Sequence, residues 1–272
     1  MSINTVIAEK NYKKLSLKVT LDGFTYCIFD TLNHRVDFVN SIDFSNYPKT
    51  NKVEEYFYKA FLEHRELTKS YDKILVLHEN NWNSFVPKAL FDEDFLGNYL
   101  QFNTKVFETD FFMFDEVSNY EMNNVYVPFS DVNNYLLDQF GQFDYKHSNS
   151  ILTEKLLDLS KNIDEKLVFV HFESNQFQII VVENKKLLFF NNFDFQTKED
   201  FIYYLLFTVE QLNLNPENFK LQFLGAMQQE SPYFEIAYRY IRNVSMLDVS
   251  DLSSKNDFSV SDNLKHFILF QS

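Results

Sequence analysis

Glycine is scarce in this sequence, with only 4 in 272 residues. Loops that wrap phosphate groups use glycine because a residue without a side chain lets backbone N–H groups approach the ligand. The sequence contains neither a P-loop nor a dinucleotide-binding fingerprint, and no Ser-His-Asp order is visible. These absences leave the sequence more informative about fold than about reaction.

Cysteine is almost absent as well, since Cys27 is the single example and cannot form an internal disulfide. It lies inside an apolar stretch, and no neighbouring histidine or basic residue is evident that would lower its pKa. We therefore predict a buried structural thiol and not a nucleophile.

Positive charge is also in short supply. Lysine and arginine total 25 against 39 aspartates and glutamates, which gives a net charge of −14, and the basic residues form no run longer than a pair such as Lys13-Lys14. Such a surface repels phosphate backbones and anionic lipids, so we expect no nucleic-acid partner. No apolar run approaches ~18 residues and no signal peptide is evident. The chain is expected to be soluble and cytoplasmic, without direct membrane insertion, and its oligomeric state is not indicated.

Aromatic residues are plentiful, with 32 phenylalanines and 16 tyrosines. Most lie at positions that face inward in the strands and helices expected from the hydrophobic pattern. We interpret them as core residues in preference to a ligand platform. A chain of this length can bury a large core and is expected to form two lobes.

The chain is organised around residues 166–225. Three apolar strands are expected at 166–173, 177–183 and 187–195, joined by short turns into an antiparallel meander. Thr197 and Asp200 form a capping-box pattern at the start of a helix with apolar residues at helical spacing. A buried strand at 220–225 follows, and this order indicates an α/β layer arrangement.

The same order occurs about 150 residues earlier. Strands are expected at 15–21, 24–30 and 36–44, a helix at 53–67 and a fourth strand at 73–78. The first hairpin turns, at Asp22 and Ser174, lie 152 residues apart, the third strands 151 and the fourth strands 147. Shared order and spacing with little residue identity indicate an ancient duplication.

The region between the two units is less regular. We expect a helix at 87–100, short strands at 110–114, 124–128 and 143–146, and helices at 131–140 and 150–161. A helix at 232–243, a polar loop at 249–262 and an edge strand at 267–270 are expected to complete the chain. The predicted boundaries are a first lobe at 1–104, a small inserted α/β subdomain at 105–148, and a linker helix with the second lobe at 149–272.

This layout resembles the actin-like superfamily that includes actin, Hsp70 and sugar kinases. The chain is similar to its bacterial branch, which contains the cell-division actin homologue and the platform proteins of type IV pilus and type II secretion machines. It is identified as a member of the uncharacterised bacterial domain-of-unknown-function family 3822. The resemblance implies a duplicated actin-like ATPase fold around a nucleotide cleft, with a small inserted subdomain.

The resemblance also implies an acidic residue and then a glycine in each first hairpin, which organise Mg²⁺ and approach phosphate. Here Thr20 and His171 take the acidic positions, while Asp22 and Glu173 take the glycine positions, although a one-residue slip would make Asp22 the acid. The adenosine motif is reduced to Gly225 and Ala226. The nucleotide motifs are therefore predicted to be degenerate.

Several residues carry two interpretations. If ATP and Mg²⁺ bind, the contacting residues are expected among the following: Asp22, Gly23, Thr25, Ser174 and Gly225. The alternative is a plain hairpin turn at Asp22-Gly23 and a strand-end glycine at Gly225.

Thr20, His171 and Glu173 are expected to lie in the cleft at the ends of the central hairpins. His171 and Glu173 could also be a metal or acid/base pair, but two residues make neither a zinc site nor a triad, and the structural interpretation is preferred.

A further pattern concerns Phe111, Phe112 and Phe114, which either line a peptide groove in the small subdomain or pack in its core.

We therefore expect a non-catalytic actin-like scaffold or adaptor, a pseudo-ATPase that binds another protein or a peptide and has no metal and no cofactor. The relatives imply a short peptide as the ligand, which could add a strand to an open sheet edge. Two alternatives remain: a nucleotide-binding protein with weak ATPase or kinase activity, and a metal-dependent hydrolase using His171 and Glu173. Fold alone does not decide among them.

Overall fold

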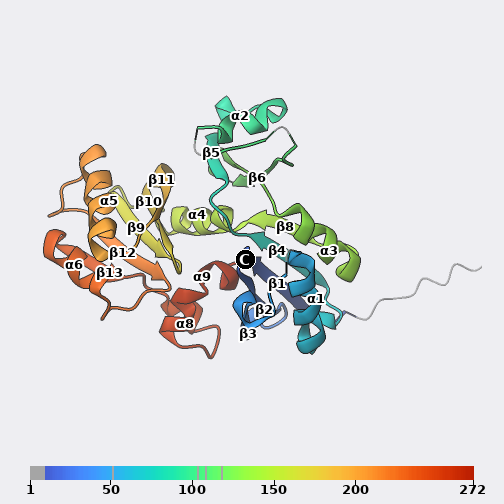
Figure 1. The fold of residues 1–272 in the computed structure, drawn as a ribbon. Coiled ribbons are helices and arrows are strands. Elements are labelled where there is room, and N and C mark those ends of the chain that lie inside the picture. The colour runs from blue at the N-terminus through green and yellow to red at the C-terminus, as the bar shows by residue number, and fades with distance from the viewer. Residues whose placement is uncertain (1–9, 51, 103, 108, 118) are drawn as a thin grey trace, which may run out of the picture. The chain divides into compact units, whose positions relative to one another are not determined.

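The chain folds into two compact units in a computed structural model that describes residues 10–50, 52–102, 104–107, 109–117 and 119–272 (Figure 1). Unit 1 combines the chain up to Glu79 with Pro128–Lys146, and unit 2 combines Asn80–Val127 with His147–Ser272. The chain therefore passes between the units three times.

Unit 1 is built on a five-stranded sheet in the order β3-β2-β1-β4-β8. Its strands are β1 Lys13–Val19, β2 Gly23–Asp30, β3 Arg35–Asp43, β4 Lys73–His78 and β8 Asp144–His147. Helices α1 Val53–Glu63 and α3 Ser130–Phe140 pack against each other and supply apolar side chains to one buried cluster with the sheet. Short 3₁₀ turns lie at Phe44–Asn46 and Arg65–Thr68.

The large sheet of unit 2 has five strands in the order β11-β10-β9-β12-β13. Its strands are β9 Leu167–Phe172, β10 Gln176–Glu183, β11 Lys186–Asp194, β12 Lys220–Gly225 and β13 Asn243–Met246. Helices α5 Lys198–Gln211 and α6 Pro232–Tyr240 share its apolar cluster. Helix α4 Ser148–Leu159 contacts β10 and β11, and α7 Ser250–Ser253, α8 Val260–Lys265 and α9 Phe267–Phe270 complete the unit.

A small antiparallel sheet also belongs to unit 2, in the order β5-β7-β6. Its strands are β5 Asn83–Pro87, β6 Met113–Val117 and β7 Met122–Tyr126. Two 3₁₀ turns, Lys88–Leu90 and Glu93–Phe95, lead into α2 Leu96–Leu100. Val86, Leu100 and Val125 form a small buried cluster between α2 and the sheet, so this layer has a core of its own.

The two five-stranded sheets have the same plan, which confirms the predicted α/β arrangement and its internal repeat. In each, a three-strand meander is followed by a helix and by a strand that pairs in parallel with the first strand of the meander. Each sheet then gains a fifth strand beside that one, β8 in unit 1 and β13 in unit 2. The repeat therefore extends one helix and one strand beyond the predicted unit.

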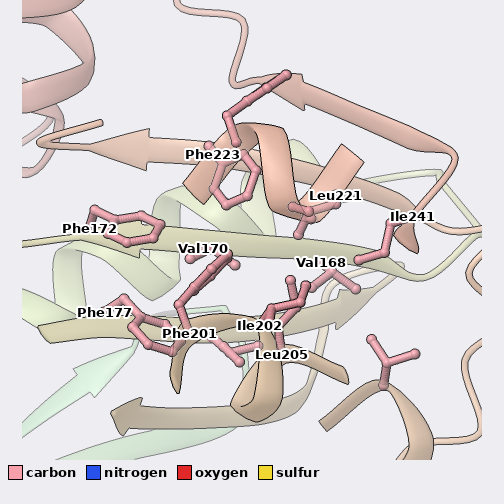
Figure 2. Close-up of a cluster of buried hydrophobic side chains, with 14 of the residues drawn as sticks. Val168, Val170, Phe172, Phe177, Phe201, Ile202, Leu205, Leu221, Phe223 and Ile241 are labelled. Atoms are coloured by element: carbon pink, nitrogen blue, oxygen red, sulfur yellow. The ribbon is translucent and has the colours of Figure 1, made fainter. Parts of the chain in front are cut away.

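The core of unit 2 combines phenylalanine rings with aliphatic side chains (Figure 2). Phe201 of α5 is fully buried, with its ring centroid 5.1 Å from Phe177 and 5.2 Å from Phe172. The α5 helix begins with the predicted capping box, since Thr197 accepts from the Asp200 N–H and the Asp200 carboxylate accepts from the Thr197 N–H. The cap fixes where the helix starts and so places Phe201 over the sheet.

Parts of the irregular regions differ from expectation. A helix was expected at 87–100, but Pro87 is the last residue of β5, because residues 83–87 pair with β7. The chain then continues through two turns into the short helix α2. The expected edge strand at 267–270 is the helix α9, with all four side chains buried. The expected polar loop at 249–262 contains α7 and the start of α8.

The predicted boundary of the small subdomain, 105–148, also differs from the division of the chain in space. β8 hydrogen-bonds into the first sheet, and Pro128–Lys146 folds with unit 1. Strand β5, which precedes the predicted boundary, is part of the small sheet. In the described part of the chain, no helix is both long and apolar enough to cross a membrane.

The aromatic core leads to a stability prediction for Phe201→Ala. Removing a fully buried ring should lower the free energy of unfolding by about 3–5 kcal/mol, because both the transfer energy and the cavity oppose the folded state. Tyr203→Ala, on the same helix but 61% exposed, is the matched control and should change it by less than about 0.5 kcal/mol. Urea unfolding followed by near-ultraviolet circular dichroism measures both; equal effects would contradict the assigned core.

Candidate functional site

The first hairpin of unit 1 is closed by its own backbone and side chains. The Thr20 N–H and hydroxyl both donate to the carbonyl of Gly23, at 2.9 and 3.0 Å, and the Asp22 N–H donates to Thr20 Oγ1 at 3.3 Å. The backbone groups of a phosphate loop would point toward a ligand. Here the N–H of Thr20 is used within the turn, which favours the plain hairpin interpretation of Asp22-Gly23.

Gly23 has a structural reason to be glycine. A Cβ at this position would lie 2.2 Å from the carbonyl oxygen of Ile42, on the neighbouring strand β3. Thr25 lies on the exposed side of the same hairpin, where its hydroxyl pairs with Ser41 at 2.9 Å. Close packing of β2 on β3 therefore accounts for Gly23 without a ligand.

A nearly buried ion pair, absent from the sequence predictions, lies at the end of the central parallel strands of unit 1. Lys18 Nζ is 2.5 Å from Glu79 Oε2, and the two side chains are 13% and 5% exposed. Removing either partner would leave a charge in a poorly solvated place, so the pair holds together firmly. A lysine in an otherwise apolar strand end was the signal that could have identified it.

The corresponding end of unit 2 is also occupied by protein side chains. The buried His171 places Nδ1 2.5 Å from Gln178 Oε1, and its Nε2 lies 3.5 Å from Glu173 Oε1. The Glu173 N–H donates to the carbonyl of Gln176 and so closes the turn that contains Ser174. His171 and Glu173 thus lie together, in a cluster that includes Gln178.

Gly225 ends β12 beside these residues and has a positive φ of 87°. A Cβ there would lie 2.2 Å from the Phe172 carbonyl oxygen and 2.9 Å from Cδ2 of His171. The Ala226 N–H donates to the same carbonyl at 2.8 Å. The backbone therefore crosses Phe172 so closely that only glycine fits.

The strand registers revise the predicted correspondence between the two hairpins. Val19 pairs with Phe24 and His78, and Phe172 pairs with Phe177 and Gly225. Val19 and Phe172 are therefore equivalent, at a difference of 172 − 19 = 153 residues.

By the same offset Lys18 corresponds to His171, and Thr20 corresponds to Glu173. The earlier match of Thr20 with His171 followed linear sequence and missed the position of the turn. At both equivalent inner positions a basic side chain faces an acid, Glu79 in one unit and Glu173 in the other.

The three phenylalanines of the small subdomain do not share one surface. Phe112 and Phe114 are partly buried against the cluster of Val86, Leu100 and Val125. Phe111 is 53% exposed. Two of the three thus contribute to packing, and Phe111 alone presents a large apolar surface.

The remaining reactive residues are structural. Cys27 is buried, as predicted, and burial raises the pKa of its thiol to about 12, so it is not a thiolate at neutral pH. Among the residues that the structure describes, no three His, Cys, Asp or Glu side chains gather closely enough to hold a metal ion.

A buried polar network in unit 2 also escaped sequence reasoning. The carboxylate of Asp115, on β6, accepts from the Ser150 hydroxyl at 2.5 Å and from the His147 N–H at 2.8 Å. The Tyr126 hydroxyl donates to its other oxygen at 3.2 Å. All four residues are at least nine-tenths buried, so the network joins the small sheet to the start of α4 inside the protein.

The network continues through three asparagines. Asn83 Nδ2 donates to Asn124 Oδ1, Asn124 Nδ2 donates to Ser150 Oγ, and Asn149 Nδ2 donates to Asn83 Oδ1, at 2.9–3.0 Å. Each side chain is at least 96% buried. Asn124 falls inside the strand expected at 124–128, whereas Asn83 and Asn149 lie outside every expected strand and helix.

The backbone at Gly225 gives a prediction for Gly225→Ala. The variant combines a positive φ with a collision against Phe172, so it should lose at least about 2 kcal/mol in the free energy of unfolding. Gly141→Ala is the matched control: φ is 79° there, but no atom lies within 4 Å of the added Cβ, and the loss should be about 1 kcal/mol. Denaturant unfolding compares them, and a smaller loss at Gly225 would contradict the close approach.

His78, fully buried at the end of β4, gives a pH prediction. Burial lowers its pKa from 6.5 to about 4, while Asn133 opposes the shift to a smaller extent. Its Nδ1 accepts from the Phe129 N–H at 3.2 Å, so the native state holds a neutral ring. Because the unfolded chain takes up the proton first, this contribution to stability is complete above pH 6.5 and is lost as the pH falls to about 4.

The difference corresponds to roughly 3 kcal/mol between those pH values. His78→Asn keeps an acceptor for Phe129 and should remove this part of the pH dependence. His34→Asn, at an exposed turn, should leave it unchanged. Urea unfolding at pH 4.5 and 7.5 tests this, and an identical pH dependence in wild type and His78→Asn would refute it.

Several solved structures have a similar fold. A Bacteroides thetaiotaomicron protein with an actin-like ATPase fold and unknown function is 20% identical, covers 97% of this chain and 97% of its own, and has a TM-score of 0.80. A chain of the PilM–PilN type IV pilus biogenesis complex is 9% identical, with 94% and 96% covered and a TM-score of 0.57. The cytoplasmic domain of EpsL, an inner membrane component of the Vibrio cholerae type II secretion system, is 12% identical, with 89% and 94% covered and a TM-score of 0.49.

The first of these matches establishes the actin-like ATPase fold and confirms the expected resemblance. At such low identities the likeness extends to the fold and not to activity. No curated protein matches the sequence. The model of one family does match it, over residues 3–244, and the chain therefore belongs to the family described as "Protein of unknown function (DUF3822)".

Proposed function

We propose that this protein is a non-catalytic actin-like scaffold or adaptor that binds another protein or a peptide. The observation that carries the proposal is the pair of occupied strand ends. Lys18, the cation at the end of β1, is held by Glu79, and His171 at the end of β9 is held between Gln178 and Glu173. A phosphate group would have to displace these contacts and then face Glu79 or Glu173 as a like charge.

The glycines support the same conclusion. Gly23 and Gly225 are the glycines expected to approach a nucleotide. At each of them an added Cβ would lie 2.2 Å from a backbone carbonyl oxygen, so packing within the protein already requires glycine there. Preorganised sites lose function when several parts are absent together. The proposed protein therefore retains the actin-like framework and uses it without ATP turnover, Mg²⁺ or another cofactor.

The partner class is inferred from the structural relatives. PilM is seen in complex with PilN. The net charge of −14 argues against nucleic acid in favour of a protein ligand. Association with a membrane machine would then pass through such a partner.

Calorimetric titration of the full chain with Mg-ATP separates the proposal from its alternatives. No measurable heat of binding is expected at millimolar ATP. A dissociation constant in the micromolar range would establish a nucleotide-binding protein, with weak ATPase or kinase activity to be assayed next. Stoichiometric metal in the purified protein would instead support a hydrolase using His171 and Glu173.

A double substitution tests how much of the site is missing. His171→Asp with Glu173→Gly removes one acid from the turn and adds a carboxylate that could organise Mg²⁺. We expect Mg-ATP to raise the melting temperature of this variant by less than about 1 °C, since Lys18, Glu79 and the close-packed glycines are unchanged. A restored site filled at 1,000 times its dissociation constant would instead add about 4 kcal/mol.

His171→Asn with Glu173→Gly is the matched control, because it has the same shape without the added carboxylate. Each variant is compared with itself, with and without Mg-ATP, so that any loss of basal stability from the buried substitution cancels. A large stabilisation of the aspartate variant alone would show that the rest of the site is intact, contrary to the proposal.

A further inference from the structure

A groove in unit 2 lies between two strand edges. It has a volume of about 470 Å³ and is lined on one side by β5 with the residues before it, and on the other by seven of the eight residues from Leu187 to Asp194. The ring of Phe85 meets that of Phe190 edge to face, with centroids 4.9 Å apart, and Asn81 Nδ2 donates to Gln176 Oε1 at 2.6 Å. These contacts hold the two walls together.

Both walls are edge strands. In the described residues, β5 pairs with β7 alone and β11 with β10 alone, and Figure 1 shows β11 as the strand of its sheet nearest to β5. The Val127 N–H donates to the Trp82 carbonyl and the Lys88 N–H to the Glu121 carbonyl. Because antiparallel pairs alternate, the backbone groups of Asn83 and Phe85 point away from β7.

The same alternation applies to β11. The Phe195 N–H donates to the Asn175 carbonyl, so Phe190, Asn192 and Asp194 turn their backbone groups away from β10. The N–H of Asn192 is bonded to the Asn191 side chain at 3.0 Å, an acceptor that can rotate away. The edge therefore offers a ladder of alternate donors and acceptors.

This edge lacks the charges that usually protect a strand from unwanted pairing. β11 has charged residues at its ends, Lys186 and Asp194, and seven uncharged residues between them. Its counterpart in unit 1, β3, is also an edge strand but carries Asp37 in its interior, in contact with Lys13 and Arg35. The equivalent strand in unit 2 therefore lacks this protection where the groove lies.

One side chain in the groove needs a donor. Asn192 Oδ1 is buried and accepts no hydrogen bond from the residues that the structure describes. A buried acceptor without a partner is costly. Of the lining residues, Asp194 is charged and negative and the others are neutral, which disfavours acidic side chains in the occupant.

We infer that this groove is the peptide-binding site, and that it takes an extended segment of a partner protein without acidic side chains, added as a strand along β11. The inference rests on the proposed scaffold function. The lining of β11 covers eight residues, about 26 Å at ~3.3 Å per residue, so the segment should be seven to nine residues long. Recognition would come from the backbone ladder, with the Phe85 and Phe190 rings contacting an apolar side chain.

The probe is a library of random ten-residue linear peptides, selected for binding to the full chain. Bound peptides are expected to be depleted in Asp and Glu, and hydrogen exchange should show protection at Phe190, Asn192 and Asp194. Methylating alternate backbone nitrogens of a selected peptide should weaken binding more than 10-fold in one set of positions and less than 3-fold in the other. Equal effects of both sets would overturn strand addition.

The protein variant is Asn192→Pro, which removes an outward N–H that edge strands can lose without losing a bond to their own sheet. It should weaken binding at least 10-fold. Ser41→Pro is the matched control. Ser41, on β3, pairs with Thr25 as Asn192, on β11, pairs with Gln178. The N–H of Ser41 is likewise bonded to the side chain of the preceding asparagine. If Asn192→Pro does not fold, the methylation series and the exchange pattern decide.

Three outcomes would overturn the inference. In the first, the exposed Phe111→Ser abolishes peptide binding while Asn192→Pro keeps it. In the second, protection of β11 depends on protein concentration, which would reveal a second copy as the occupant. In the third, no peptide is selected. The Mg-ATP titration is independent of all three. A protein that ignores ATP and binds peptides elsewhere would keep the scaffold proposal and remove the groove.

Discussion

The buried carboxylate of Asp115 fixes the internal geometry of unit 2. A carboxylate removed from water is tolerated when several donors surround it, and the Ser150 hydroxyl, the His147 N–H and the Tyr126 hydroxyl do so here. Since Asp115 lies on β6 and Ser150 on α4, the small sheet is tied to this helix by directional bonds. The same helix contacts β10 and β11, so the separation of β5 from β11 depends on a polar network and not on apolar packing alone.

The duplication preserved the interior and changed the ends and edges. Both sheets keep the same strand order, and each buries an aromatic cluster beneath the helix that follows its meander. At the inner strand ends, Lys18 pairs with Glu79, directly after β4, whereas His171 pairs with Glu173, two residues further along the sequence. Packing constrains the faces of a sheet strongly, while its rim can diverge with little cost to folding.

Sequence patterns predicted the fold because its signals are local. The meanders, the capping box at Thr197 and the inward stripe of α5 depend on hydrophobic period and on neighbouring residues. The strand at 83–87 was missed because its partner lies about 40 residues away and Pro87 suggested a helix start. The helix α9 was missed because four apolar residues in a row fit a strand and a buried helix equally well.

The candidate site was less accessible to sequence reasoning. Thr20 was matched with His171 because linear motifs carry no information about register, and the pairing of Val19 with Phe24 is what identifies Lys18 as the counterpart. Glu79 and Asn192 gave no signal, since their importance arises from burial and from residues distant in the chain. Asn83 and Asn149 lay outside every expected strand and helix, and polarity alone cannot show that a network satisfies a buried asparagine.

The scarcity of glycine has a consequence for how the turns are built. Eight described residues other than glycine adopt a positive φ, four of them asparagines, whereas Gly141 and Gly225 are the described glycines that do so. Each side chain held in that region costs free energy that glycine would not, and the Asn184-Lys185 hairpin turn, with φ of 40° and 68°, is an example. Replacing a residue of such a turn by glycine, as in Lys185→Gly, should therefore raise the free energy of unfolding without changing either core.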